Sequence, residues 1–326
     1  MERINWIDWA KALGITLVVM GHSNYSFPPH LVGMIFMIHM PLFFFISGYL
    51  FNAEGSYMDL AINNWKRLVV PYICFNVISA LFVLADFGIK AFLGREVDWN
   101  AVFWTPLWHT LLGQSGGGLF CGVTWFLLAL VWCKFLMHAI CKGPWGVRIG
   151  VVVLWAILLS VRLYSGSSFY YSIDCGLVGF IWFGLGFLAR QVRAGVSIPI
   201  LVWLLLIPIG AFICYYGLMH NGQCNYIAAD VKGVMGVIYT GAGLLSFFGV
   251  CKLLDGVHSK LIVRISKASL LIMCLHMLIM LPMQKILHYQ YHSWLTLLGD
   301  ISIVLIITAF YPIIEKYAPI LTGGRK

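Results

Sequence analysis

Ten apolar runs of about twenty residues each are the feature that most constrains this chain. A run of this length crosses the hydrocarbon core of a bilayer as a helix. Of the 326 residues, 61% are hydrophobic and only 10% are charged, a balance that excludes an ordinary soluble domain. We therefore predict an all-α integral membrane protein of about ten transmembrane helices, with residues 1–326 forming one membrane domain and no soluble domain. The runs lie at residues 7–26, 31–51, 68–87, 123–141, 149–165, 172–189, 198–219, 233–253, 268–288 and 295–314.

The lysine and arginine residues predict the orientation of the chain. If the N-terminus is cytoplasmic, fourteen of the 21 basic residues fall on the inner side, three fall inside runs and four fall on the outer side. Cytoplasmic loops carry such an excess, so both termini are predicted to be cytoplasmic. The same bias explains the formal net charge of +9 without a basic patch, and no nucleic-acid partner is expected. The four outer residues are Lys90, Arg95, Lys232 and Lys285.

Four ionisable residues lie inside or at the edge of the first two runs, namely Asp8, Lys11, His22 and His39. Ionisable side chains inside a membrane cost free energy and are functional candidates by default. Lys11 and His22 are eleven residues apart, which places them about 20° apart around a helix and roughly 16 Å apart along its axis. Asp8 falls about 40° from the same line. One helix is therefore predicted to carry an aspartate, a lysine and a histidine on one face.

Later runs contain further candidates. Ser269 and His276 are seven residues apart in the ninth run, so they share a helix face, and His276 is expected in the middle of the membrane. Arg162 and Asp174 lie at the outer ends of adjacent runs, where they form either a structural ion pair or groups that bind an acceptor substrate. Trp125 is either a residue of the interfacial aromatic belt or a platform for a sugar.

The histidines and Lys11 also have structural explanations that the sequence leaves open. Lys11 could extend to the inner headgroups, and His22 could be an interfacial histidine. His39 could be a packed histidine bonded to a backbone carbonyl that Pro41 leaves free. His276 could form a hydrogen bond between two helices.

Nine cysteines are scattered through the chain without the spacing of metal ligands, so no metal site is predicted. Most lie in apolar runs and are expected to be small hydrophobic residues. Pairing among Cys121, Cys175 and Cys224 is the less favoured alternative.

The ionisable residues suit acyl transfer, which needs a base or nucleophile, an orienting carboxylate and cations for an anionic donor. His22 is the best base, because an imidazole can take a proton from a sugar hydroxyl or carry an acyl group briefly. Asp8 and Lys11 are too far along the helix to touch His22 and are expected at the donor end of the same channel.

Two alternatives to an enzyme remain open. A transporter or flippase for a glycan or a small organic acid also needs buried histidine, aspartate and lysine residues. Carriers often contain an internal repeat, and none relates residues 1–160 to residues 165–326, which favours the enzyme. A structural subunit of a glycan synthase is the third possibility.

The chain resembles the membrane acyltransferase-3 family, the multi-span bacterial O-acetyltransferases of surface glycans. The first two matches are specific together: a basic residue ten residues before a histidine, Lys11-x10-His22, and IHMPLFFFISGYLF at 38–51. Three weaker matches follow in order, KRLVVPY at 66–72, TWFLLAL at 124–130 and ISKASLLIMCLH at 265–276. One departure is Lys11 itself, where many members have arginine, so a planar bidentate donor is lost although the charge is kept.

The resemblance implies acetyl-CoA, or another acyl-CoA, as the donor and a carbohydrate hydroxyl as the acceptor. The expected acceptor is a surface polysaccharide or a lipid-linked glycan precursor, as in lipopolysaccharide or exopolysaccharide biosynthesis. The protein is expected in the bacterial plasma (inner) membrane as a multi-pass enzyme. The sequence lacks the appended extracytoplasmic esterase-like domain of some members, so transfer is expected to be completed within the membrane domain.

The resemblance also implies roles for particular residues. Lys11 and His22 take the catalytic roles, with Asp8 beside Lys11 at the inner end. Lys66 and Arg67 suit the phosphates of CoA, by their charge and their position at the inner surface. The candidates for binding the acceptor substrate are His39, Trp125, Arg162, Asp174, Ser269 and His276.

Overall fold

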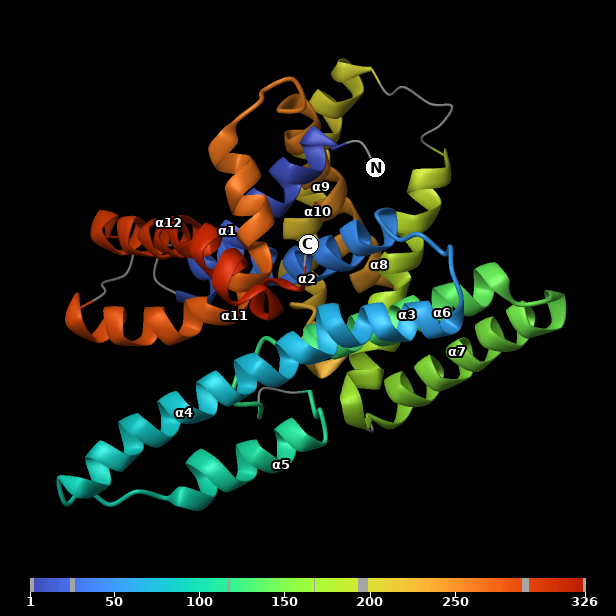
Figure 1. Cartoon of the computed structure of the whole chain (residues 1–326). Helices are drawn as coiled ribbons and strands as arrows, with labels where there is room; N and C mark the ends of the chain where they lie inside the picture. The colour runs from blue at the N-terminus through green and yellow to red at the C-terminus, as the bar shows by residue number, and fades with distance from the viewer. Residues whose placement is uncertain are drawn as a thin grey trace. The chain divides into compact units, whose positions relative to one another are not determined.

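The computed structural model describes residues 3–23, 27–115, 118–166, 168–192, 199–288 and 293–324. Within these ranges the chain is built from helices, and the one extended pairing is an isolated bridge between Asn225 and Asp230 (Figure 1). The long helices are α1 (Asn5–Ser23), α2 (Pro29–Tyr49), α4 (Val70–Phe92), α6 (Trp125–Lys142), α7 (Trp145–Ser165), α8 (Ile173–Val192), α9 (Ile200–Asn221), α10 (Gly233–Leu253), α11 (Lys260–Ile286) and α12 (Trp294–Tyr317). The short ones are α3 (Tyr57–Asn64), η1 (Trp65–Val69), η2 (Asn100–Trp104), α5 (Thr105–Leu111), η3 (Tyr170–Ser172), η5 (Tyr226–Ala228) and η6 (Pro319–Thr322).

Nine helices of the described ranges are long and apolar enough to cross a membrane. They correspond in order to the nine predicted runs from 31–51 to 295–314. The third predicted run, 68–87, proves to be part of one continuous helix of 36 residues, Tyr57–Phe92, which joins α3, η1 and α4. The prediction of an all-α, multi-span membrane protein is therefore confirmed, whereas the cytoplasmic placement of the termini stays a prediction.

The first predicted run, 7–26, forms α1, a helix of 19 residues that is less apolar than the other nine. This helix packs against α2, α10 and α11. More than half of its residues are buried, including Asp8. Three surrounding helices shield α1 from lipid, so it can carry polar side chains that a lipid-facing helix would exclude.

The chain divides into two compact units. Unit 1 comprises Met1–Leu50, Trp182–Tyr226 and Asp230–Pro312, and unit 2 comprises Phe51–Ile181, Ile227–Ala229 and Ile313–Lys326. Two of the boundaries between them fall inside α8 and α12. The single membrane domain expected from the sequence stays a prediction.

In unit 1, α9 and α10 pack closely because glycines leave room for the opposite helix. A Cβ atom on Gly243 would lie 2.7 Å from the Cys214 sulfur, and one on Gly249 would lie 2.7 Å from the Ile207 side chain. Gly210 lies against the backbone of Ala242 in the same way. The missing side chains let α9 and α10 approach more closely than two helices with larger residues at these positions could.

In unit 2, two π-helical turns precede proline at the same offset. Pro71 has no backbone N–H, and just before it the N–H of Val70 bonds the Trp65 carbonyl, five residues back, instead of four. The N–H of Thr105, before Pro106, bonds the carbonyl of Asn100 in the same way. A missing donor thus produces a local widening of each helix.

All nine cysteines are free and seven of them are buried, so pairing of Cys121, Cys175 and Cys224 is wrong. Each of these three thiols is buried, as expected of a small hydrophobic residue. Several residues used in the sequence argument lie outside the described ranges: the inner-side cations Arg193, Arg325 and Lys326.

Candidate active site

Three histidines from three helices of unit 1 lie together: His22 on α1, His39 on α2 and His276 on α11. The His22 ring centroid is 5.1 Å from that of His276 and 6.1 Å from that of His39. The Phe36 ring lies 5.3 Å from both His22 and His39. We call His22, His39 and His276 the histidine cluster. The sequence named each of the three as a candidate but did not predict that they meet.

Each histidine of the cluster bonds the backbone through the same ring atom. Nδ1 lies 2.8 Å from the Val18 carbonyl oxygen in His22 and 3.0 Å from the Ile35 carbonyl oxygen in His39. In His276 it lies 3.0 Å from the carbonyl oxygen four residues back and 2.7 Å from the one three residues back. A carbonyl oxygen only accepts, so Nδ1 carries the hydrogen and Nε2 keeps the lone pair of the neutral ring.

The consequence is a group of imidazoles with their basic nitrogens available. His276 is fully buried, and its Nε2 has no hydrogen-bond partner among the described residues. His39 is buried and His22 is half-buried. Buried polar atoms normally have a hydrogen-bond partner, so an imidazole nitrogen without one is available to bind a ligand or a proton. The cluster can accept a proton from a hydroxyl group.

The structure corrects one explanation of His39. Pro41 lies within α2 and deprives the Met37 carbonyl, four residues earlier, of its usual donor. His39 instead bonds the Ile35 carbonyl, one turn before its own position. His22 and His276 make the same bond without a nearby proline, so the bond follows from helix geometry and not from Pro41.

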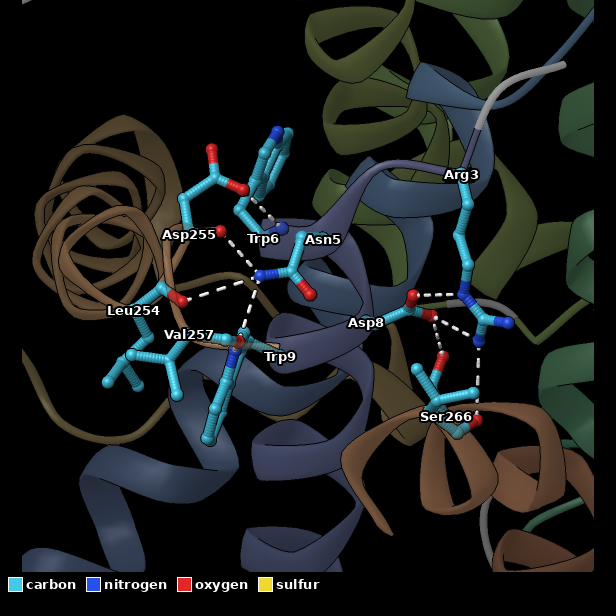
Figure 2. Close-up of polar contacts among 10 residues, drawn as sticks. Arg3, Asn5, Trp6, Asp8, Trp9, Leu254, Asp255, Val257 and Ser266 are labelled. Atoms are coloured by element: carbon cyan, nitrogen blue, oxygen red, sulfur yellow. Dashed lines mark hydrogen bonds and ion pairs between the residues drawn. The ribbon is translucent and has the colours of Figure 1, made fainter. Parts of the chain in front are cut away.

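Asp8, on α1, is engaged in contacts that link α1 to α11 (Figure 2). Arg3 Nη2 donates to Asp8 Oδ1 at 3.2 Å, and Arg3 Nε donates to Oδ2. Ser266 Oγ donates to Oδ1 at 2.6 Å. The hydrogen bond to Asp8 raises the pKa of the Arg3 guanidinium. These contacts describe a link between helices, and a catalytic role of Asp8 stays a prediction.

Beside Asp8, the start of α1 caps the turn between α10 and α11 (Figure 2). The Asn5 side-chain amide donates to the carbonyls of Asp255 and Val257, the latter at 3.0 Å. The indole of Trp9 donates to the Val257 carbonyl at 2.9 Å, and the backbone N–H of Trp6 donates to the Asp255 carboxylate at 2.9 Å. Backbone carbonyls at and just beyond the end of a helix have no partners within that helix. The start of α1 therefore provides hydrogen-bond donors for the carbonyls of this turn.

The sequence analysis missed Asn5 and Ser266 at this end of unit 1. Ser266 lies in ISKASLLIMCLH, three residues before the predicted Ser269. Ser266 is buried and touches Asp8, whereas Ser269 is half-buried. A small polar side chain in an otherwise apolar helix indicates a contact with another helix. The sequence cannot show whether Ser266 or Ser269 makes this contact, because the answer depends on where the partner helix lies. Lys11, one turn beyond Asp8 on α1, is half-buried.

Unit 2 holds the remaining predicted residues. Lys66 and Arg67 lie in the π-helical turn η1 and both are exposed. Trp125, the first residue of α6, is buried, so it does not face lipid as a belt residue would.

Arg162 and Asp174 form the predicted ion pair. Arg162 Nε lies 3.7 Å from Asp174 Oδ2, and both side chains are buried. A second guanidinium nitrogen donates to the Ala228 carbonyl. Asp174 also accepts from the Ser115 hydroxyl at 3.2 Å and from the backbone N–H of Cys175 at 2.9 Å. This geometry is that of the structural alternative, and acceptor binding by either residue stays a prediction.

Among the described histidine, cysteine and acidic residues, no group of three is arranged to hold a metal ion.

Comparison with known proteins identifies the chain. A family model described as an acyltransferase domain, that of acyltransferase family 3, matches residues 4–315, nearly the whole length. No curated protein and no solved structure matches the chain. The match spans both units and every helix that contributes to the histidine cluster. It decides in favour of an enzyme over a transporter or a structural subunit. The chain belongs to the acyltransferase-3 family and is a membrane-bound acyltransferase.

Proposed function

We propose that this enzyme transfers a short acyl group, in the simplest case acetyl, from acyl-CoA to a hydroxyl of a carbohydrate. The acceptor is a surface polysaccharide or its lipid-linked precursor, and the enzyme acts in the bacterial inner membrane. The observation that carries the proposal is the histidine cluster, in which Nδ1 of each ring is bound to a backbone carbonyl. This arrangement leaves Nε2 as a base within a membrane helix bundle.

In the proposed reaction His22 Nε2 accepts the proton of the acceptor hydroxyl. The hydroxyl oxygen then forms a bond to the thioester carbonyl carbon, and the carbon–sulfur bond breaks. The departing thiolate takes the proton from the His22 imidazolium, so charge and protons balance. The bond from Nδ1 to the Val18 carbonyl keeps the tautomer and the ring orientation fixed throughout. In a variant of the scheme His22 carries the acyl group before the hydroxyl attacks.

His39 and His276 are assigned to the acceptor hydroxyl. Their rings are in contact with the His22 ring, so a hydroxyl bound at His22 is within reach of a second imidazole. Because Nδ1 of each ring donates to the backbone, each Nε2 offers a lone pair to the hydroxyl hydrogen, so a second imidazole can share the proton that His22 accepts. Ser269, seven residues before His276 on the same helix face, and Trp125 remain proposed acceptor contacts.

Acyl-CoA supplies the activated thioester and three phosphate groups. Lys66 and Arg67 are proposed to bind the phosphates, because both are exposed cations in the same turn. Lys11 is proposed to act at the donor end of α1, roughly 16 Å along the helix from His22. Its single ammonium supplies charge without the bidentate geometry of arginine.

The test uses the purified full chain in lipid nanodiscs with labelled acetyl-CoA and a lipid-linked glycan extract. Label is expected to enter the glycan with the wild-type protein and to be lost in His22→Gln. His220→Gln is the matched control. Like His22, His220 bonds the carbonyl four residues back through Nδ1, but it lies exposed at the end of α9. Loss of transfer in both variants, or in neither, contradicts the role of His22.

A further inference from the structure

Asn64 and His138 are two of the buried polar side chains in unit 2 that the proposed mechanism does not use. Asn64, the last residue of α3, is 2% exposed, and His138, on α6, is 1% exposed. The amide nitrogen and oxygen of Asn64 and both ring nitrogens of His138 have no hydrogen-bond partner among the described residues. Most buried polar atoms in native proteins are paired, so four unpaired atoms on two side chains need an explanation.

The two residues lie where α3 and η1 pack against α6 (Figure 1). The rings of Tyr57 and His138 are 4.6 Å apart and nearly perpendicular. Asn64 is seven residues after Tyr57, which places it about 20° away on the same face of the helix. Further along, Arg67 and Lys134 are close enough to interact electrostatically. Asn64 therefore falls between these two contacts, on the face of α3 that meets α6.

Cations surround this region. Lys66 and Arg67 follow Asn64 in the chain, and Lys134 and Lys142 lie one turn before and one turn after His138. The helices α3 and α6 contain one acidic residue, Asp59, and it caps the start of α3 by accepting from the Ser56 N–H and hydroxyl, each at 2.8 Å. Cations gathered in one region repel each other and favour an anionic ligand.

The unpaired groups define the rest of the ligand. Asn64 offers an amide donor and an amide acceptor, and neutral His138 offers one donor and one acceptor. A phosphate alone accepts hydrogen bonds and cannot satisfy the Asn64 oxygen. The matching chemistry is a chain that carries N–H and C=O groups and ends in phosphates.

We infer that Asn64 and His138 bind the amide-bearing arm of the acyl-CoA donor, the pantetheine part, while Arg67 and Lys134 bind its phosphates. This inference rests on the proposed function, because it takes the donor to be an acyl-CoA. It adds two polar residues that recognise the arm, and it adds Lys134 to the two cations, Lys66 and Arg67, already proposed to bind the phosphates. The ring of Tyr57, a residue that is 49% exposed, packs nearly perpendicular to the His138 ring.

The experiment measures binding of two probes to the full chain in phosphatidylcholine nanodiscs. Coenzyme A carries both amides and phosphates, whereas adenosine 3′,5′-bisphosphate carries phosphates only. Asn64→Leu is expected to raise the Kd for coenzyme A about tenfold, or about 1.4 kcal/mol, and to leave bisphosphate binding unchanged. His138→Phe, which keeps an aromatic ring against Tyr57, is expected to behave alike. Arg67→Ala is expected to weaken both probes.

Asn63→Leu is the matched control, since Asn63 is the exposed neighbour of Asn64 and should affect neither probe. Asn64→Leu should also melt no lower than the wild type, because it removes unpaired buried groups. Unchanged coenzyme A affinity in both variants, equal weakening of the two probes, or a large loss of stability in Asn64→Leu would overturn the inference. If phosphatidylglycerol added to the nanodiscs displaces coenzyme A, the cations bind a lipid headgroup, and this result would also overturn the inference.

A label-transfer assay on the same samples separates this inference from the proposed function. Wild-type protein that binds coenzyme A but transfers no acetyl label contradicts the proposed function and leaves the binding comparison intact. Normal transfer with unaltered coenzyme A affinity in Asn64→Leu and His138→Phe contradicts only the inference.

Discussion

Two buried sets of ionisable residues in this enzyme differ in the chemistry of the nitrogen atoms that they leave unpaired. In unit 2, Arg162 and Asp174 form an ion pair, and their other contacts are with Ala228, Ser115 and the backbone of Cys175. Arg162 Nε has no hydrogen-bond partner among the described residues, and it is a donor without a lone pair. In unit 1, the histidine cluster uses Nδ1 of each ring for the backbone and leaves Nε2 of His276 without a partner among the described residues.

The difference separates structural from chemical roles. In a buried ion pair each charge offsets the desolvation of the other, and a guanidinium has no lone pair with which to take a proton. An imidazole held by one nitrogen keeps its orientation and still has a lone pair for a proton. Membrane burial alone made both sets candidates in the sequence, and only the partners distinguish them.

The largest expected effect is on His22. His22→Gln keeps an amide donor for the Val18 carbonyl but removes the base, so acyl transfer should fall by about a thousandfold, the usual range for a lost general base. The label-transfer assay in nanodiscs measures this. Folding is checked by comparing the melting temperature with that of His220→Gln, and a transfer rate within tenfold of the wild type would remove His22 from the mechanism.

The comparison predicts the opposite outcome for the ion pair. Asp174→Asn leaves the buried Arg162 cation uncompensated, so the free energy of unfolding should fall by about 3 kcal/mol. Transfer per folded molecule should stay unchanged. Thermal or denaturant unfolding measures the first quantity, and the double variant Arg162→Met with Asp174→Leu should recover much of the lost stability. If activity falls while the melting temperature holds, the pair binds substrate and the comparison fails.

His276 tests whether the unpaired nitrogen matters. His276→Gln keeps a donor for the backbone and removes Nε2, so transfer should fall about 10- to 100-fold, or about 1.4 to 2.7 kcal/mol of transition-state stabilisation. The rate at saturating donor should change more than the donor KM, because the acceptor hydroxyl is affected. Unfolding should shift little, since no partner of Nε2 is lost. A stability loss like that of Asp174→Asn, with unchanged transfer, would make His276 structural.

The smallest expected effect is on the link between Asp8 and α11. Ser266→Ala removes one hydrogen bond to a charged carboxylate that Arg3 still neutralises, so stability should fall by about 1 kcal/mol. Ser269→Ala, at the half-buried position one turn on, serves as the control and should change stability less. A larger activity loss in Ser266→Ala than its stability loss explains would extend the active site toward Asp8.

Much of the fold could be predicted because the bilayer limits the choices. Backbone groups inside lipid must be satisfied within the segment, so an apolar run long enough to cross has to be a helix. One helix boundary was not predicted. The start of the third helix at Tyr57 lies well before the predicted run, because Asp59 and Lys66 lower its hydropathy while the capping box at Ser56 begins the helix.

The sequence by itself determined the helices, their order, and the residues whose charge or polarity is out of place in lipid, including Lys11, His22, His39 and His276. Helix periodicity relates residues within one helix, so the shared face of Lys11 and His22 was predictable. Only the tertiary structure decided that α1, α2 and α11 bring three histidines together and that Ser266 and not Ser269 meets Asp8. It also decided that Asn64 and His138 lie beside cations without a hydrogen-bond partner in the described part of the chain. Contacts between helices depend on which faces pack, and hydrophobic runs of similar length and composition do not specify that choice.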